Sequence, residues 1–281
     1  MAAITFGPVS ALLLAALFCA HADKVITRSC GTRGLGFRVR QYPTDTEATS
    51  LIADNCQLTD VGTADFNGLP YLTAIDLEQN DIVHIHPVAF RSVPRLMILD
   101  VNRNKLRDLP VFEDQSCPNL KVLNLRENQL YILNNSKALS ACTKLEKIYL
   151  SKNNIEYLHP DLFSALTELK MLLLNNNKII FIHDSLLLNN VKLEWLEVQN
   201  NRLTYLPNEI TDGLKQINFD DNPWRCECLL ELLKDIKKEG VKYNYWMYIG
   251  LRPKCVYTAV HACSRAPSGL LLPGASVAET R

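Results

Sequence analysis

One asparagine recurs along most of this chain at a nearly constant interval. It stands at Asn80, Asn104, Asn128, Asn153, Asn177, Asn201 and Asn222, mostly 24 residues apart. Each copy lies inside the frame L-x-x-L-x-L-x-x-N-x-L, in which Ile, Val or Phe replaces some leucines. Self-similarity at a short fixed period predicts a solenoid of stacked turns, which offers a long surface rather than a deep pocket.

The frame has a physical reason. Its alternating apolar residues predict a short strand with one buried face, while the asparagine turns inward to bond backbone groups that would otherwise be unpaired. Large apolar residues, expected to fill the opposite wall of the coil, stand six positions before the first leucine of most units: Phe66, Phe90, Leu139, Phe163 and Leu187. Asp114 breaks this series, and we expect Phe112 to fill the wall there.

About eight units can be read in this way. A degenerate first unit carries Leu51 and Leu58 with Cys56 in the asparagine position, and a shortened last unit carries Leu214 and Phe219. The pattern over residues 48–224 is identified as a member of the leucine-rich repeat family, of the extracellular 24-residue type. The resemblance implies an α/β repeat solenoid, a curved horseshoe with a parallel sheet on its concave face and disulfide-bonded caps at its ends.

The two ends of the sequence differ from the repeats. Residues 1–22 are apolar and close in a small-x-small site, which predicts a cleaved secretory signal peptide. The alternative is an uncleaved signal anchor, because the apolar run is nearly long enough to span a bilayer. No later segment is apolar for that length, so we expect a secreted, extracellular product without a membrane span, and a flexible tail over residues 264–281.

Eight cysteines remain once Cys19 is removed with the signal, and an even set in an exported chain favours disulfides. Cys117 and Cys142 each lie three residues before the leading leucine of adjacent units. Neighbouring strands are about 4.8 Å apart and a disulfide joins Cα atoms roughly 5.5–6 Å apart, so the two cysteines are predicted to pair. The alternative is that both are small, free core residues.

The group Asn222, Pro223, Trp224, Cys226 and Cys228 resembles the start of the C-terminal flanking cap of extracellular leucine-rich repeat proteins. The resemblance implies a cap over residues 225–263, with Cys226 bonded to Cys255 and Cys228 to Cys263. An amphipathic run from Leu229 to Ile236, ending at Gly240, predicts the helix that closes the solenoid. Cys30 and Cys56 are then left to pair, which would tie an N-terminal cap at residues 23–47 to the first turn.

Signals for chemistry are weak. Thirty basic and thirty acidic residues leave no net charge, which argues against a nucleic-acid partner, and no cofactor motif or nucleophile elbow is present. His86, His159 and His183 share one register position, but we interpret them, with His84, as outer-turn residues rather than metal ligands. We therefore predict no enzyme activity, no cofactor and no metal site. The sequon at Asn134 predicts a glycan.

A partner is expected to bind the concave face. The x positions inside L-x-x-L-x-L point away from the core, and in the early units they are acidic. In later units they predict an exposed apolar cluster in which Tyr149 lies beside Leu173 and Met171 beside Trp195. With two residues of earlier units, the candidate binding residues are Ile98, Val122, Tyr149, Met171, Leu173 and Trp195. The alternative is that the chain itself covers them.

Together these features predict a secreted, non-enzymatic recognition protein that binds another extracellular protein or a microbial ligand. The chain is similar to small immune leucine-rich proteins of insects, particularly mosquitoes, which implies pathogen recognition in the body fluid. Residues 264–281 contain no heptads and no cysteine, unlike the coiled coils that join many of those proteins in pairs. The alternatives are an adhesion or signalling module related to receptor or guidance ectodomains, and an extracellular scaffold or inhibitor.

Overall fold

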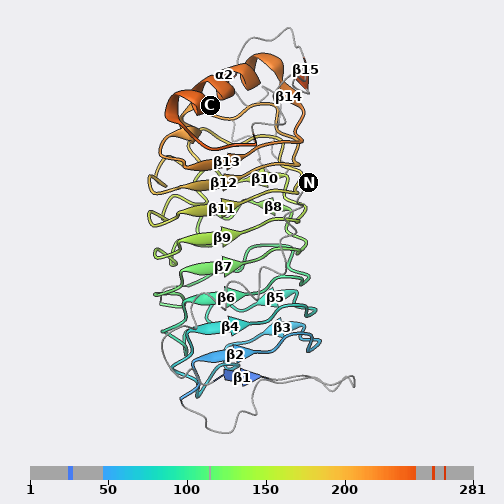
Figure 1. The fold of residues 1–281 in the computed structure, drawn as a ribbon. Coiled ribbons are helices and arrows are strands. Elements are labelled where there is room, and N and C mark those ends of the chain that lie inside the picture. The colour runs from blue at the N-terminus through green and yellow to red at the C-terminus, as the bar shows by residue number, and fades with distance from the viewer. Residues whose placement is uncertain (1–24, 28–46, 114, 245–254, 257–262, 264–281) are drawn as a thin grey trace, which may run out of the picture.

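The computed structural model describes residues 25–27, 47–113, 115–244, 255–256 and 263. Its main element is a nine-stranded parallel sheet in which each strand lies beside the next along the chain. The strands, in spatial order, are β1 (Val25–Thr27), β2 (Ser50–Ile52), β4 (Ala74–Asp76), β6 (Ile98–Asp100), β7 (Val122–Asn124), β9 (Lys147–Tyr149), β11 (Met171–Leu173), β12 (Trp195–Glu197) and β13 (Gln216–Asn218). Figure 1 shows these strands stacked from β1 to β13, which confirms the predicted solenoid.

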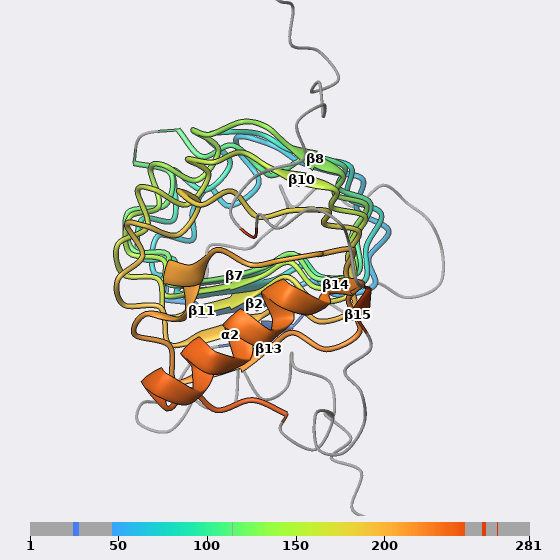
Figure 2. The same ribbon diagram turned by 90° about the horizontal axis from the view of Figure 1, so that it is seen from above.

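The return half of each turn contains less helix than the predicted α/β class implies. Two-residue strands lie opposite the large sheet: β3 (Asp60–Val61) pairs with β5 (His84–Ile85), and β8 (Ile132–Leu133) with β10 (Tyr157–Leu158). The described return segments are otherwise turns, with one short 3-10 helix, η1 (Asn208–Thr211). Seen along the stack in Figure 2, every turn is a flattened ring around an apolar interior.

The recurrent asparagines hold adjacent rings together as predicted. The Asn128 side chain accepts a hydrogen bond from the backbone N–H of Leu106 at 3.0 Å, and its Nδ2 donates to the carbonyls of Val101 and Leu125 at 3.0 and 3.1 Å. Asn80, Asn104, Asn153, Asn177, Asn201 and Asn222 bond equivalent groups of their own turn and the one before. Buried backbone groups of the bend are thereby paired.

A left-handed residue precedes each of these asparagines. Gln79, Arg103, Glu127, Lys152, Asn176, Asn200 and Asp221 have φ between 52° and 57°. Such a conformation costs a non-glycine residue roughly 1–2 kcal/mol. In each of these residues except Asp221, the N–H of the same residue bonds the next turn, as from Arg103 to the Arg126 carbonyl at 2.9 Å, which offsets this cost. The conformation turns the chain so that asparagine points inward.

Aromatic rings line part of the opposite wall. Phe66 stacks on Phe90 with centroids 5.3 Å apart, and Phe90 on Phe112 at 6.0 Å. Phe112 is buried and takes the place in this column that Asp114 leaves, as expected; Asp114 lies outside the described residues. The interior is therefore one continuous hydrophobic core along the stack.

The C-terminal end is closed by the predicted helix, α2 (Cys226–Glu239), which lies across the last turn in Figure 1. Leu229, Leu232 and Ile236 are buried, and Gly240 ends the helix at φ 68°, donating its N–H to the Ile236 carbonyl. Beside it, β14 (Trp224–Arg225) pairs with β15 (Cys255–Val256). The indole of Trp224 donates to the Phe219 carbonyl at 3.0 Å, which joins the cap to the last turn.

The disulfides follow the predicted pairing wherever both cysteines are described. Cys117 bonds Cys142 across adjacent turns, with Cα atoms 5.2 Å apart. Cys226 bonds Cys255 and Cys228 bonds Cys263, which ties the cap helix to the segment after it. Cys56 is also disulfide-bonded, whereas its predicted partner Cys30 lies outside the described residues. The predicted signal peptide at 1–22 and the predicted tail at 264–281 also lie outside them.

Candidate recognition surface

The outward face of the nine-stranded sheet presents side chains in two parallel columns. The strand register fixes their order, because equivalent residues of successive strands are direct neighbours. The first column runs Ala74, Ile98, Val122, Lys147, Met171, Trp195 and Gln216, and the second runs Asp76, Asp100, Asn124, Tyr149, Leu173, Glu197 and Asn218. The surface therefore changes along the stack, from acidic near β4 and β6 to apolar near β11 and β12.

The register confirms the predicted neighbours but corrects their exposure. Leu173 lies beside Tyr149, and Met171 beside Trp195. Ile98, Val122 and Tyr149 are each only 7% exposed, so the interpretation of these three as exposed residues is wrong. They pack with Ala74 into a cluster outside the main core, against Met97, Met171 and Leu173. Side chains on strands about 4.8 Å apart cover one another, which a single strand pattern does not reveal.

Three apolar side chains remain half-exposed on this face. We call Met171, Leu173 and Trp195 the concave apolar patch. Trp195 is held in place because its indole Nε1 donates to Glu197 Oε1 at 3.1 Å, and the same carboxylate accepts from Gln199 and Asn218 at 3.2 and 3.1 Å. A large aromatic side chain fixed before binding loses little conformational freedom when a partner covers it.

The acidic end of the face contains two buried carboxylates that lie side by side. Asp76 and Asp100 are 7% and 6% exposed and occupy paired positions of β4 and β6. Burial raises the pKa of Asp76 to about 7; a hydrogen bond from the Glu78 N–H opposes this rise, and the charges of Asp100, Glu78 and Asp54 add to it. Burial also raises the pKa of Asp100, against hydrogen bonds from Asn102 and Asn124. Asp76 is thus partly protonated near neutral pH, and Asp100 holds its proton more tightly than a free aspartate does.

Ion pairs between turns border the two columns. Arg103 contacts Glu78 at 3.1 Å and Glu127 at 3.0 Å, and Lys152 contacts Glu127 at 3.0 Å. Opposite charges one period apart in the sequence could have predicted these pairs. They neutralise the bend beside the sheet, so the outward columns determine the local charge that a partner meets.

Burial raises the pKa of Tyr149 to about 12, with further contributions from the charges of Asp100 and Glu197. Its phenol is therefore protonated at physiological pH and retains a hydrogen to donate. Tyr149 is thus a neutral group that lies between the acidic end and the apolar end of the face.

The histidines in register have a structural role in the return turns. Nδ1 of His86, His159 and His183 accepts a hydrogen bond from the backbone N–H two residues later, at 3.3, 3.1 and 3.1 Å. This side-chain cap of a turn agrees with their interpretation as outer-turn residues. The described residues hold no cluster of three or more His, Cys, Asp or Glu side chains suited to a metal ion.

Asn134 is exposed directly after β8, on the opposite side of the ring from the large sheet. A glycan there remains a prediction, and it would leave the large sheet uncovered. Within the described ranges, no helix has the length and hydrophobicity needed to cross a lipid bilayer.

An open solenoid with a regular outward sheet and a disulfide-bonded C-terminal cap defines a class of repeat proteins that present an extended surface. A sequence model described as Leucine rich repeat matches residues 46–106, 118–179 and 143–203. The chain belongs to the leucine-rich repeat family. No curated protein matches the sequence significantly.

Many solved structures are similar to this chain, and two of them illustrate the likeness. One is the crystal structure of a TLR13–ssRNA13 complex, with 27% identity and a TM-score of 0.49. The match covers 63% of this chain and 30% of that one, so this chain spans less than a third of its length. The other is human 5T4 (Wnt-activated inhibitory factor 1, trophoblast glycoprotein), with 23% identity, a TM-score of 0.57, and coverage of 72% of this chain and 80% of that one. The second shares the fold.

Proposed function

We propose that this protein is a secreted, non-enzymatic recognition module that binds a protein partner through the outward face of its large sheet. The observation that carries the proposal is the concave apolar patch, in which Met171, Leu173 and Trp195 lie together, half-exposed, on adjacent strands. Aromatic side chains in such clusters dominate the energetics of many protein interfaces. Tyr149 supports the patch from beneath rather than forming its exposed part.

The disulfides support an extracellular setting. Cys117–Cys142, Cys226–Cys255 and Cys228–Cys263 are bonds that persist in oxidising compartments. Secretion through cleavage of residues 1–22 agrees with this chemistry and is part of the proposal.

The charge of the face favours a protein over a nucleic acid. Glu197 lies in the second column of this face, where its carboxylate would repel a phosphate backbone. The chain as a whole carries no excess of basic residues to offset that repulsion. We therefore retain the expectation of an extracellular protein, or a microbial ligand with an apolar surface, as the partner.

The biological setting that we propose is innate-immune recognition, which the resemblance to insect proteins suggests. An adhesion or signalling role would use the same face. The two are distinguished by whether the partner captured by the protein is a microbial surface component or complement-like protein, or instead a host cell-surface protein.

Site-specific photo-crosslinking tests the proposal. A photoreactive amino acid replaces Leu173 on the sheet face in one protein and Val83, which is 55% exposed beside β5, in a control. Irradiation in extracellular fluid of the source organism should attach a partner protein to the first and not to the second. Equal labelling from both positions, or labelling from Val83 alone, would contradict the use of this face.

A further inference from the structure

One cation interrupts the apolar column of the sheet face. Lys147 lies between Val122 and Met171 in the first column, so its neighbours on both adjacent strands are apolar. Its side chain is half-exposed, and it forms no ion pair within the described part of the chain. A partner that covers the concave apolar patch also removes water from this ammonium, and a charge without water or a counter-charge is costly. The position therefore favours a partner that supplies the counter-charge.

The carboxylate next to Lys147 in the sequence already has two partners. Glu146 contacts Lys121 at 3.1 Å and Lys170 at 2.8 Å. The next acids along this margin of the sheet form ion pairs of their own, Glu168 with Lys192 at 2.6 Å and Glu194 with Lys215 at 2.7 Å. The margin thus keeps an excess of positive charge beside the concave apolar patch.

A second donor without a partner lies two residues further along β9. Tyr149 faces outward with Lys147, because alternate residues of a strand share one face. Its hydroxyl makes no hydrogen bond within the described residues and, unlike the amide oxygens of Asn175 and Gln199, is not closed off from solvent. The pKa of about 12 keeps the phenol protonated, so it can donate. An ammonium and a phenol side by side are donors that a carboxylate can satisfy together.

Carboxylates of the protein itself lie on either side of this point but at a distance. Asp100 on β6 and Glu197 on β12 are each two strands from β9, roughly 10 Å away. Burial raises the pKa of Asp100, which weakens its repulsion of an acid. Glu197 already accepts hydrogen bonds from Trp195, Gln199 and Asn218. An acidic group of a partner is therefore attracted most strongly at β9, between the two.

We infer that the partner contributes an acidic side chain to Lys147 and Tyr149, next to the apolar group that covers the concave apolar patch. This inference rests on the function proposed for the sheet face and adds the chemistry of the partner. Met171 and Leu173 are the direct neighbours of Lys147 and Tyr149 on β11. The acid and the apolar group are then roughly 5–10 Å apart, a spacing that residues two apart on an extended segment provide. A polyanionic glycan would leave the apolar patch uncovered.

Peptide selection tests the inference before the partner is known. Phage that display random heptapeptides are selected on the immobilised natural protein, on Lys147→Glu and on Lys137→Glu. Lys137 is a matched control, because it is an exposed lysine without an ion pair that lies outside the large sheet. We expect the natural protein and Lys137→Glu to enrich peptides with Asp or Glu near an aromatic or aliphatic residue. Peptides selected on Lys147→Glu should lack the acid.

The affinity of one selected peptide, labelled and followed by fluorescence anisotropy, measures each contact. Lys147→Glu should raise Kd at least about tenfold, because attraction becomes repulsion. Tyr149→Phe removes only the hydroxyl and should raise Kd about fivefold. Lys137→Glu should stay within about twofold. Thermal unfolding verifies that the variants fold.

The outcomes separate this inference from the proposed function. Selected peptides that need Trp195 but carry no acid would overturn the inference and leave the proposed function intact, as would equal affinity for the natural protein and Lys147→Glu. Acidic peptides without an apolar residue would show charge attraction alone and would also overturn it. If no peptide is selected, or if Trp195→Ala binds every selected peptide unchanged, the proposed function fails and this inference fails with it.

Discussion

Each recurrent asparagine bonds backbone groups of two turns, so one side chain satisfies polar groups that no water reaches. The side chain of Asn128 is 6% exposed and contacts the Leu106 N–H together with three carbonyls. At the residue scale, the period is therefore a requirement of hydrogen bonding as much as of hydrophobic burial.

Replacing Asn128 by alanine should lower the free energy of unfolding by about 3 kcal/mol or more, because several buried backbone groups lose their partner. Asn134→Ala, in protein made without glycosylation, is the control, since Asn134 is exposed and should change stability by less than about 0.5 kcal/mol. Urea unfolding followed by circular dichroism measures both. Equal stability of the two variants would contradict the claim that Asn128 stabilises the fold by bonding buried backbone groups.

Asp76 makes a different prediction, for the dependence of stability on pH. Its folded-state pKa of about 7 lies above the ordinary value of 3.8, so the folded protein holds this proton more tightly than the unfolded chain. The resulting stabilisation is complete below about pH 4 and is lost as pH rises through 7. Asp76→Asn removes this loss, so the variant should gain about 2–4 kcal/mol relative to the natural protein between pH 5 and pH 8.

The pH comparison reports on Asp76 together with its neighbour Asp100, whose charge contributes to the raised pKa of Asp76. Hydrogen bonds from Lys170 and Lys121 lower the pKa of Glu146, which therefore titrates below this window. Asp100, whose pKa is raised, is present in both proteins, as are Glu78 and Asp54. Denaturant midpoints of the natural protein and Asp76→Asn at pH 5 and pH 8 test this prediction. A stability difference that is the same at both pH values would show that Asp76 titrates in its ordinary range.

At the scale of elements, strands of only three residues owe their order to their neighbours on either side. Each ring contributes one strand, one left-handed bend and one return segment, and the Cys117–Cys142 bond joins two return segments in the middle of the stack. Stability in such a stack is close to a sum of terms for each unit and each interface between units. A crosslink at one interface should therefore act on the turns nearest to it.

Replacing both Cys117 and Cys142 by alanine should lower the free energy of unfolding by about 3 kcal/mol, the value expected for a loop of 25 residues. Hydrogen exchange should rise first in the turns that contain β7 and β9, while the turns near α2 keep their protection. Uniform loss of protection along the chain would show that the stack unfolds as one cooperative unit instead.

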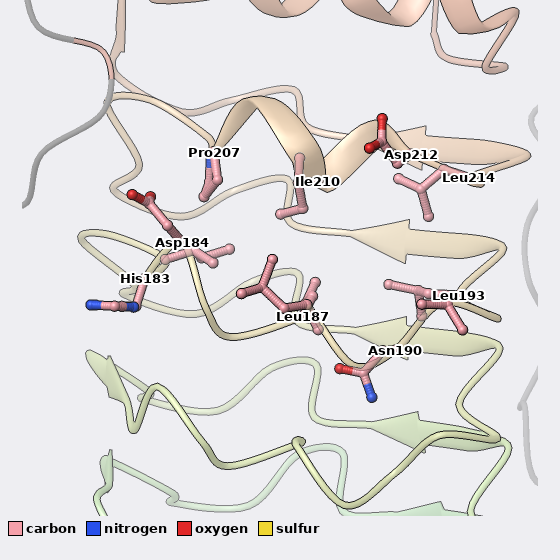
Figure 3. Close-up of a pocket in the computed structure, with 12 residues that line it drawn as sticks. His183, Asp184, Leu187, Asn190, Leu193, Pro207, Ile210, Asp212 and Leu214 are labelled. Carbon is pink, nitrogen blue, oxygen red and sulfur yellow. The ribbon is translucent and has the colours of Figure 1, made fainter.

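Much of the fold, and the direction of the outward side chains, could be predicted because one period sets both. The placement of Tyr149 beside Leu173 required only the register. The burial of Ile98, Val122 and Tyr149 could not be predicted, because it depends on how side chains of adjacent rings cover each other. A cavity of about 240 Å³ between residues 182–193 and η1 could not be predicted for a related reason: the shortened last unit was visible in the sequence, but the gap depends on the path taken by η1 (Figure 3).

At the scale of the whole molecule, the solenoid gives one long face whose chemistry changes from Asp76 to Trp195, with a helix closing one end. The fold requires asparagine at the bend of each turn, but it places no such requirement on the side chains of the outward columns. Specificity is therefore set by side chains that the fold tolerates in many forms. The concave apolar patch is where the outward face of the large sheet departs most from a polar surface, and recognition by that patch is the central claim.

The most direct test is the affinity of the crosslinked partner for Trp195→Ala, measured by surface plasmon resonance. The natural protein and Leu230→Glu, a change at an exposed position of α2 away from the sheet face, are measured as controls. Loss of a central aromatic anchor should raise Kd by about 30-fold or more, equivalent to about 2 kcal/mol, while Leu230→Glu stays within about twofold. Unchanged circular dichroism of both variants excludes unfolding as the cause. A Trp195→Ala protein that binds as tightly as the natural one would contradict the claim that this face recognises the partner.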